Sequence, residues 1–204
     1  MPTKPGERKS QILETLAHML EVPQGEKITT AALAAKLDVS EAALYRHFAS
    51  KAQMYEGLIE FIEQTVFSLI NKIATEETRG LKQLESVIAL LLAFAQKNQG
   101  MTRVLIGDAL VHEDNRLQAR INQLHDRIES SLRQSLRIAA SQNDLDPAIE
   151  ANAMANLLMC FVVGRWHQFG KSGFKRLPTE MWATQWSALG LGSASSASGN
   201  EDST

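Results

Sequence analysis

The chain has 204 residues, of which 44% are hydrophobic and 22% are charged, and its formal net charge is −2 at pH 7. This composition is typical of a soluble globular protein and excludes a polycation that would bind nucleic acid through bulk charge. The most apolar runs, residues 87–95 and 153–163, are shorter than the roughly 20 residues of a membrane-spanning helix, so we expect no membrane partner. A lone Cys160, expected to be buried, and the lack of an apolar stretch after the charged N-terminus indicate a cytoplasmic location.

The first predicted helix spans residues 7–21. Four apolar side chains fall on one stripe at helical spacing: Ile12, Leu13, Leu16 and Leu20. We expect Gly25 to end this segment and the helix to cover the following segment from behind.

Residues 28–51 predict two short helices joined by a tight turn. Together they form a helix-turn-helix, the unit that places one helix in the DNA major groove. Its buried face consists of Leu33, Leu37, Val39, Leu44 and Phe48. Ala34 lets the helices cross closely, Asp38 takes the left-handed turn position, and Ser40 and Ser50 stand as N-caps of the two following helices. An ordinary helical hairpin of a bundle would need the same apolar pattern, but not the polar outer face.

The outer face of this unit carries hydroxyl groups and cations that can reach phosphates and base edges. Residues 1–51 hold seven Lys and Arg against six Asp and Glu, so DNA binding would depend on a few placed contacts. We expect phosphate contacts from Thr30, Tyr45, His47 and Lys51, and base-edge contacts from Glu41, Ala42 and Ala43 on the second helix, residues 41–48. Thr29 and Ser40 complete the predicted DNA-binding set. Arg46 is expected to point to solvent on the far side of the helix.

The rest of the chain predicts further helices and shows no strand pattern. A long helix runs from residue 51 to about 75, residues 81–97 form a mostly buried helix, and a shorter piece lies between Gly100 and Gly107. A heptad-like seam follows at Leu117, Ile121, Leu124 and Ile128, surrounded by arginines at positions 116, 120, 127 and 133. The seam does not persist, which favours a long amphipathic helix of a bundle over an extended coiled coil. Residues 141–147 form a loop.

Two apolar helices close the chain. Residues 148–169 are apolar on nearly every side, so we expect burial all round, and residues 177–189 form a shorter helix capped by Thr179. These helices suggest a subunit interface, for which we expect Leu158, Phe161, Val162, Arg165, Trp166, Trp182 and Trp186. Alternatively, these residues belong to the core of the single chain. Both hold if one face of a helix packs in the core and another face forms the subunit interface. The tail, residues 192–204, is polar and of low complexity, so we expect disorder.

The sequence contains no constellation typical of an enzyme: no phosphate-binding loop, no glycine-rich dinucleotide turn and no paired-cysteine site. The histidines never fall at the i, i+4 spacing of a helical zinc pair. Asp108, His112, Glu113 and Asp114 could hold a cation, but a solvated, charged helix end is the commoner meaning of such a cluster. We therefore expect no catalysis, no cofactor and no metal.

The Leu-Tyr-Arg-His-Phe run at residues 44–48, followed by Lys51 at the start of a long helix, resembles the TetR family of regulators. The resemblance covers residues 9–60. It implies an all-α, Ω-shaped homodimer, with an N-terminal helix-turn-helix DNA-binding domain of three helices (1–52), a C-terminal helical domain for dimerisation and partner binding (53–191) and the tail. The two C-terminal helices of each subunit would form a four-helix interface, and two recognition helices would read a palindrome in double-stranded DNA.

A narrower resemblance, over residues 8–177, is to the nucleoid occlusion factors, TetR-like proteins of bacterial cell division. It is carried by SEAALYRHFASK at 40–51, LIEFIE at 58–63 and RLQARINQLHDRIESSLRQSLR at 116–137. It implies a nucleoid-bound protein that antagonises polymers of the tubulin-like division protein FtsZ. The FtsZ tail would lie in a groove formed by Phe61, Gln64, Ser68, Leu69, Leu90, Ala93, Lys97 and Asn98. The chain departs from this group at Leu69, where an arginine is expected, and at Ala93, where a glycine is expected.

Three roles for the C-terminal domain therefore compete. It is a platform for the division machinery, a pocket for a small ligand as in a ligand-responsive TetR-type transcriptional repressor, or a helical interaction module that has kept the fold without using DNA. The resemblance at residues 116–137 favours the first role.

Overall fold

The computed structural model describes residues 5–22 and 28–191, and the regular structure within these ranges is helical. Its elements are α1 (Pro5–Met19), α2 (Thr30–Lys36), α3 (Glu41–Tyr45), α4 (Lys51–Glu76), α5 (Gly80–Lys97), α6 (Gln99–Leu105), the 3-10 turn η1 (Asp108–Leu110), α7 (Asn115–Ser141), α8 (Ala151–Lys171) and α9 (Trp182–Ala188). The predicted all-α class is confirmed. Among the described helices, none combines the length and the apolar character that crossing a bilayer requires.

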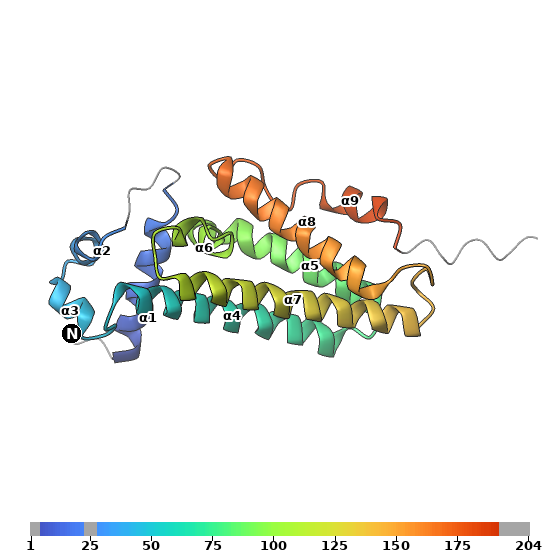
Figure 1. Cartoon of the computed structure of the whole chain (residues 1–204), viewed down its shortest axis with the longest axis horizontal. Helices are drawn as coiled ribbons and strands as arrows, with labels where there is room; N and C mark the ends of the chain where they lie inside the picture. The colour runs from blue at the N-terminus through green and yellow to red at the C-terminus, as the bar shows by residue number, and fades with distance from the viewer. Residues whose placement is uncertain (1–4, 23–27, 192–204) are drawn as a thin grey trace, which may run out of the picture.

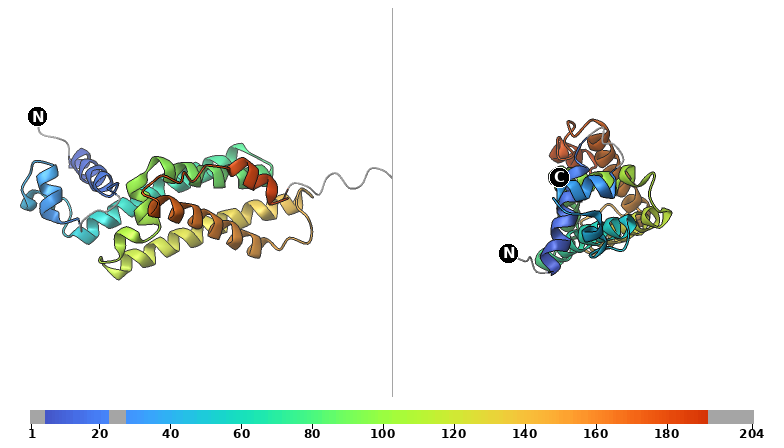
Figure 2. Two further views of the ribbon diagram at one scale, coloured as in Figure 1. Left: turned by 90° about the horizontal axis from the view of Figure 1, so that it is seen from above. Right: turned by 90° about the vertical axis from the view of Figure 1, so that its left-hand side faces the viewer.

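The molecule is elongated, with a small head at one end and a long helical body. Figure 1 shows α1, α2 and α3 together at one end, while α4, α5, α7 and α8 extend away from them. Figure 2 shows the same separation from above, with the head projecting beyond the body. Helix α4 starts beside α1 and continues into the body, so it belongs to both parts.

The body is organised around α7, which packs against α4, α5 and α8. The predicted seam of α7 is buried, and burial continues beyond Ile128 through Leu132 and Leu136 to Ala139. Steps of four residues turn the apolar stripe gradually around the helix, which suits contacts with several neighbours rather than one coiled-coil partner. The helix is therefore amphipathic within a bundle, as the interrupted seam predicts.

Two arginines beside this stripe join α7 to α4. The Arg120 guanidinium donates to both carboxylate oxygens of Glu63, at 2.8 Å and 3.2 Å, and this hydrogen bonding raises the pKa of Arg120. The Arg127 guanidinium carbon lies 3.9 Å from the centroid of the Phe67 ring. Such bidentate and cation–π contacts fix the rotation of α7 relative to α4.

Two glycines permit close helix contacts that any side chain would prevent. A Cβ atom on Gly80 would lie 2.2 Å from the backbone nitrogen of Ala139, where the start of α5 meets the end of α7. A Cβ atom on Gly100 would lie 1.9 Å from the carbonyl oxygen of Ala17, where α6 meets α1 in the head. Gly100 is thus not only a helix boundary, as its sequence position suggests, but a contact point between body and head.

Several predicted boundaries are wrong by a few residues. Helix α1 ends at Met19 instead of residue 21, and α3 ends at Tyr45, although Phe48 is still buried. Helix α9 begins only at Trp182, and Thr179 does not cap it, because the Thr179 hydroxyl hydrogen-bonds to Gln96 Oε1 at 2.6 Å. The predictions for Gly25 and for the tail lie outside the described residues.

Helix α8 is not buried on all sides of the single chain, which corrects the prediction. Its bulky residues Leu158, Val162 and Trp166 face the chain's own core. On the opposite side Leu157 is 54% exposed, and Cys160, predicted to be buried, is exposed as well. Apolar composition alone could not show which side of the helix the remainder of this chain covers.

Candidate nucleic-acid interface

The helix-turn-helix forms as the sequence predicts. Asp38 has a left-handed backbone with φ of 53°, and Leu33, Ala34 and Leu44 are buried between α2, α3 and α1. The Ser40 hydroxyl oxygen accepts the amide hydrogen of Ala43, at 3.3 Å, and thereby caps α3. Ser50 caps α4 in the same way, accepting from Gln53 at 3.2 Å.

A hydrogen-bonded network joins the outer surfaces of α2 and α3. The Thr30 hydroxyl donates to Glu41 Oε2 at 2.6 Å, and the Tyr45 hydroxyl donates to Thr30 Oγ1 at 3.4 Å. Glu41 and Tyr45 remain exposed, so the network orients these side chains without removing them from the surface. The second carboxylate oxygen of Glu41 is still able to accept a hydrogen bond from a base edge.

The hydroxyl groups of Thr29 and Ser40, which cap α2 and α3, can still donate a hydrogen bond to DNA. Thr29 Oγ1 accepts the amide hydrogen of Ala32 at 3.1 Å, and Ser40 Oγ accepts that of Ala43. Because a hydroxyl has one donor as well as its acceptor lone pairs, both side chains can donate to a phosphate oxygen while they cap their helices. Ala42 is exposed beside them, whereas Ala43 is partly buried.

A cationic cleft of about 500 Å³ lies between α1 and α3. Its lining includes Arg8 and Gln11 from α1, and Arg46 and His47, which directly follow α3. Arg46 is exposed and lines this cleft, whose lining includes neither Glu41 nor Tyr45. That Arg46 points away from the DNA-facing side of the helix stays a prediction. Arg8 was not among the predicted site residues, because nothing in the sequence shows that α1 crosses α3 at this point.

Lys51, the fourth predicted phosphate contact, is engaged in an ion pair within the protein. Its ammonium group forms an ion pair with Glu113 and lies 5.6 Å above the centroid of the Tyr55 ring. The side chains of Lys51 and Glu113 are only 19% and 11% exposed. The structure thus holds the Lys51 cation between head and body, and Glu113 is a neighbour that sequence reasoning did not assign to it.

The carboxylates of the acidic cluster at residues 108–114 have partners within the protein, unlike those of a solvated helix end. Asp108 accepts from Arg103 Nε at 3.0 Å and pairs with Lys171, Glu113 pairs with Lys51, and Asp114 caps α7. These carboxylates are already matched by protein cations or amides. Among the described residues no group of three or more His, Cys, Asp or Glu could hold a metal ion.

The predicted interface residues separate into two sets. Leu158, Val162 and Trp166 are buried in the chain's own core, where the Trp166 indole nitrogen donates to the Leu91 carbonyl at 3.1 Å, so their assignment to a subunit interface is wrong. Phe161 is only partly buried and packs on α9, where its ring contacts Trp182, which in turn contacts Trp186. The Arg165 guanidinium donates to the backbone carbonyls of Leu177, Pro178 and Glu180 and holds the chain that leads into α9.

Seven of the eight residues of the expected FtsZ groove lie on α4 and α5, an antiparallel pair that packs together, and the eighth, Asn98, directly follows α5. We call them the α4–α5 face. Phe61 and Leu69, at 48% and 37% exposure, are large apolar side chains at the surface. Gln64, Ser68, Ala93 and Lys97 are exposed too, while Leu90 and Asn98 are partly buried. An apolar side chain thus stands at residue 69, where the resemblance leads us to expect a cation.

Two segments of the chain match known families. Residues 78–191 match the SlmA-like family described as "Tetracyclin repressor-like, C-terminal domain", and residues 26–58 match "Bacterial regulatory proteins, tetR family". The chain is 50% identical to the nucleoid occlusion factor SlmA of Alteromonas mediterranea, over 89% of this chain and 93% of that protein. It is 48% identical to the nucleoid occlusion factor SlmA of Marinomonas sp., over 93% and 96%.

A solved structure shares the fold at low sequence identity. The fatty acid degradation regulator FadR from Bacillus halodurans aligns with a TM-score of 0.75 and 13% identity, over 93% of this chain and 96% of that one. At this identity the likeness concerns the fold alone.

Proposed function

Because the chain belongs to the SlmA-type nucleoid occlusion factors of the TetR family, we propose that it binds palindromic DNA as a homodimer and, when bound, inhibits assembly of FtsZ. Septation over the nucleoid would thereby be prevented. The observation that supports the DNA-binding part most is the Thr30–Glu41–Tyr45 network, which orients polar side chains on an exposed surface of the recognition helix.

On DNA, the α3 helices of the two protomers enter successive major grooves about one helical turn, or roughly 34 Å, apart. Glu41 and Ala42 face base edges, where a carboxylate accepts from cytosine and a methyl group contacts thymine. Thr29, Thr30, Ser40, Tyr45, His47 and Lys51 contact phosphates, and Arg8, which lines the same cleft as His47, extends this set. Dimerisation doubles the number of phosphate contacts and so compensates for the weak net charge of each head.

The homodimer forms through the outer side of α8. This side presents Ala153, Leu157, Cys160, Gly164 and His167, which recur at helical spacing and are exposed in the single chain. Nothing lies within 4 Å of a Cβ atom built on Gly164. Small residues at the middle of the stripe allow two α8 helices to approach closely, and Leu157 supplies the apolar contact.

The division partner docks on the α4–α5 face. Phe61 and Leu69 offer exposed apolar area along α4, and Lys97 supplies a cation for an acidic tail. Domain 1–52 would read DNA and domain 53–191 would dimerise and bind the partner, with α4 continuous across their boundary.

Mapping of bound sites across the chromosome tests this proposal directly. Sites scattered over the chromosome and sparse near the terminus are expected for nucleoid occlusion. Binding restricted to one or two promoters would instead indicate a local repressor.

A second candidate function, that of a ligand-responsive repressor, is favoured by one cavity in the body. A space of about 340 Å³ lies between α4, α5 and α7, with Ile70, Val87 and Ile138 beside Ser131 and Gln134. Its mixed lining suits a small, mainly apolar ligand with a few polar groups. Release of a bound promoter fragment by such a ligand would support this role over the first.

A further inference from the structure

The ion pair between Lys51 and Glu113 joins the two parts of the molecule that must cooperate. Lys51 is the first residue of α4, directly after the helix-turn-helix, and Glu113 lies in the segment between η1 and α7. Both side chains are largely shielded from solvent. A pair in such surroundings is screened less by salt than one at the surface, so it holds the Lys51 ammonium group firmly.

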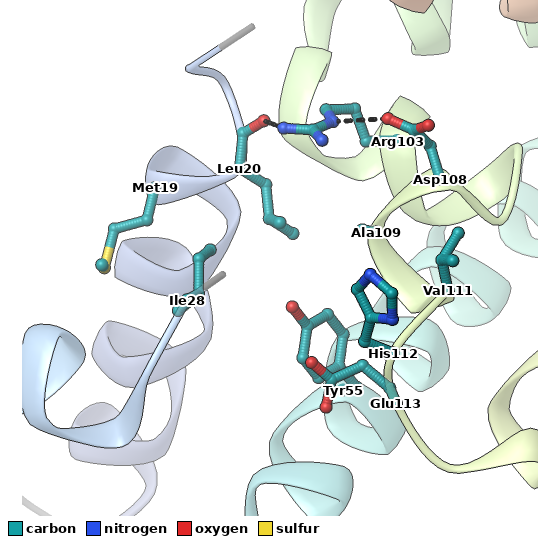
Figure 3. Close-up of a pocket in the computed structure, with 10 residues that line it drawn as sticks. All are labelled: Met19, Leu20, Ile28, Tyr55, Arg103, Asp108, Ala109, Val111, His112 and Glu113. Atoms are coloured by element: carbon teal, nitrogen blue, oxygen red, sulfur yellow. Dashed lines mark hydrogen bonds and ion pairs between the residues drawn. The ribbon is translucent and has the colours of Figure 1, made fainter. Parts of the chain in front are cut away.

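Glu113 is the anion that neutralises Lys51, because the neighbouring Tyr55 is uncharged. Tyr55 is buried beside them, and burial, reinforced by the negative charge of Glu113, raises the pKa of Tyr55 well above its ordinary value. Tyr55 therefore stays neutral and contributes only its ring face to the lysine. Glu113 and Tyr55 both line a cavity of about 430 Å³ between head and body. Figure 3 shows their two side chains next to each other.

DNA offers Lys51 a second anion. The lysine side chain is a flexible four-carbon stem with a compact charge, and it can exchange one oxygen partner for another by rotation. It cannot neutralise Glu113 and a backbone phosphate fully at the same time. Any free energy that the Glu113 pair contributes in the free protein must be given up when Lys51 moves to a phosphate.

The geometry points to Glu113 as a residue that sets DNA affinity by competing with a backbone phosphate for Lys51. This inference rests on the proposed DNA-binding function and adds a determinant located outside the helix-turn-helix. Glu113 acts on DNA only through Lys51, so it is a positioning residue and not a contact residue.

The segment that carries Glu113 is tied to other parts of the chain. Arg103 donates to Asp108 and also to the Val22 carbonyl, at 3.0 Å in each case, and Asp108 pairs with Lys171 of α8. Departure of Lys51 therefore loosens one of several links between the head and the body. The backbone of residues 106–114 should become more dynamic when DNA binds.

The test compares DNA affinity of full-length variants. A palindromic duplex enriched by the wild-type chain from a random library serves as probe, and fluorescence anisotropy measures binding at several salt concentrations. Glu113→Gln keeps the side-chain shape but removes the charge, and it should tighten binding at least about fivefold. The salt dependence should also steepen by about one counterion per protomer, since Lys51 no longer leaves a bare carboxylate behind.

Two further variants isolate the competition from general electrostatics. Asp114→Asn removes the same charge from the adjacent residue, where the carboxylate caps α7 and binds Arg116, and it should change affinity less than about twofold. In a Lys51→Ala background, Glu113→Gln should have no effect, because the competed cation is gone. Hydrogen exchange of residues 106–114 in the wild-type chain should rise on addition of the duplex.

Unchanged or weaker binding by a Glu113→Gln variant that melts cooperatively would overturn the inference, as would an equal gain in the Lys51→Ala background. If Glu113→Gln does not fold, Glu113→Asp, which withdraws the carboxylate by one methylene, should give a smaller gain in the same direction, and no gain would again overturn it. Failure of the wild-type chain to enrich any duplex would instead contradict the proposed function.

Discussion

Among single residues, Glu41 has a structural role in the helix-turn-helix, and we propose that it also reads a base. Its carboxylate accepts a hydrogen bond from the Thr30 hydroxyl at 2.6 Å, and the residue remains exposed on α3, so its other oxygen can accept a further hydrogen bond. Glu41→Gln replaces one acceptor oxygen by a donor, so discrimination at one base pair of each half-site should change by about 1–3 kcal/mol. Binding to palindromes with single symmetric substitutions measures this. A uniform loss for all sequences would show that Glu41 does not face a base.

His125 gives a second residue-scale prediction, on pH dependence. Burial lowers the pKa of His125 from its ordinary value of 6.5, and its Nε2 atom has no hydrogen-bond partner within the described part of the chain. In the unfolded chain His125 is therefore protonated below about pH 6.5, whereas in the folded chain it stays neutral to lower pH. Stability is therefore complete above pH 6.5 and falls as the pH decreases below it, by at most about 1.4 kcal/mol per pH unit.

Thermal unfolding between pH 7.5 and pH 5 checks this sign. His125→Gln should flatten the decrease in Tm, because it removes the buried imidazole whose pKa is lowered. Equal pH profiles for wild type and His125→Gln would contradict a neutral His125.

Local chemistry made several residue roles predictable. Asp38 in the turn and the caps Ser40 and Ser50 follow from the conformations that these residue types stabilise in their own neighbourhood. The partners of Lys51 and Arg8 could not be predicted, because Glu113 and the end of α3 lie far away in sequence. Only the packing of α1, α4 and the segment before α7 brings them together.

At the scale of elements, the contact between α6 and α1 holds the head to the body. A side chain at Gly100 would overlap the Ala17 carbonyl, so Gly100→Ala should lower the free energy of unfolding by about 3 kcal/mol. Gly6→Ala provides the matched control, since nothing lies within 4 Å of a Cβ atom there. Chemical denaturation measures both. An equally stable Gly100→Ala variant would show that α1 and α6 can separate at little cost.

Helices could be predicted from the sequence where apolar residues recur regularly at helical spacing. The helices around Leu33 and Leu44 and the buried stripe of α7 follow from spacing alone. The direction in which α8 faces was not predictable, because a helix with apolar residues on every side has no unique apolar stripe. Bulky side chains occupy the core of the chain, and the smaller Cys160 and Gly164 remain outside.

At the scale of the whole molecule, the outer side of α8 should hold two chains together. Leu157→Glu places a charge on this stripe and should convert the dimer into a monomer, because burying an unpaired charge between two apolar helices is strongly unfavourable. Binding to a palindrome should weaken strongly as a result. Sedimentation equilibrium reports the mass, and Leu69→Glu, at an exposed apolar residue of α4, is the control. A dimeric Leu157→Glu variant would place the interface elsewhere.

The proposed function requires the DNA-bound protein to act on the division polymer. Its most direct test is sedimentation of FtsZ polymers with the protein, with and without the enriched palindromic duplex. We predict less pelleted polymer when protein and duplex are both present, little effect of either alone, and loss of the effect in Phe61→Ala, which removes exposed apolar area from the α4–α5 face without touching the head. Unchanged polymer mass with protein and duplex together would contradict the proposed function.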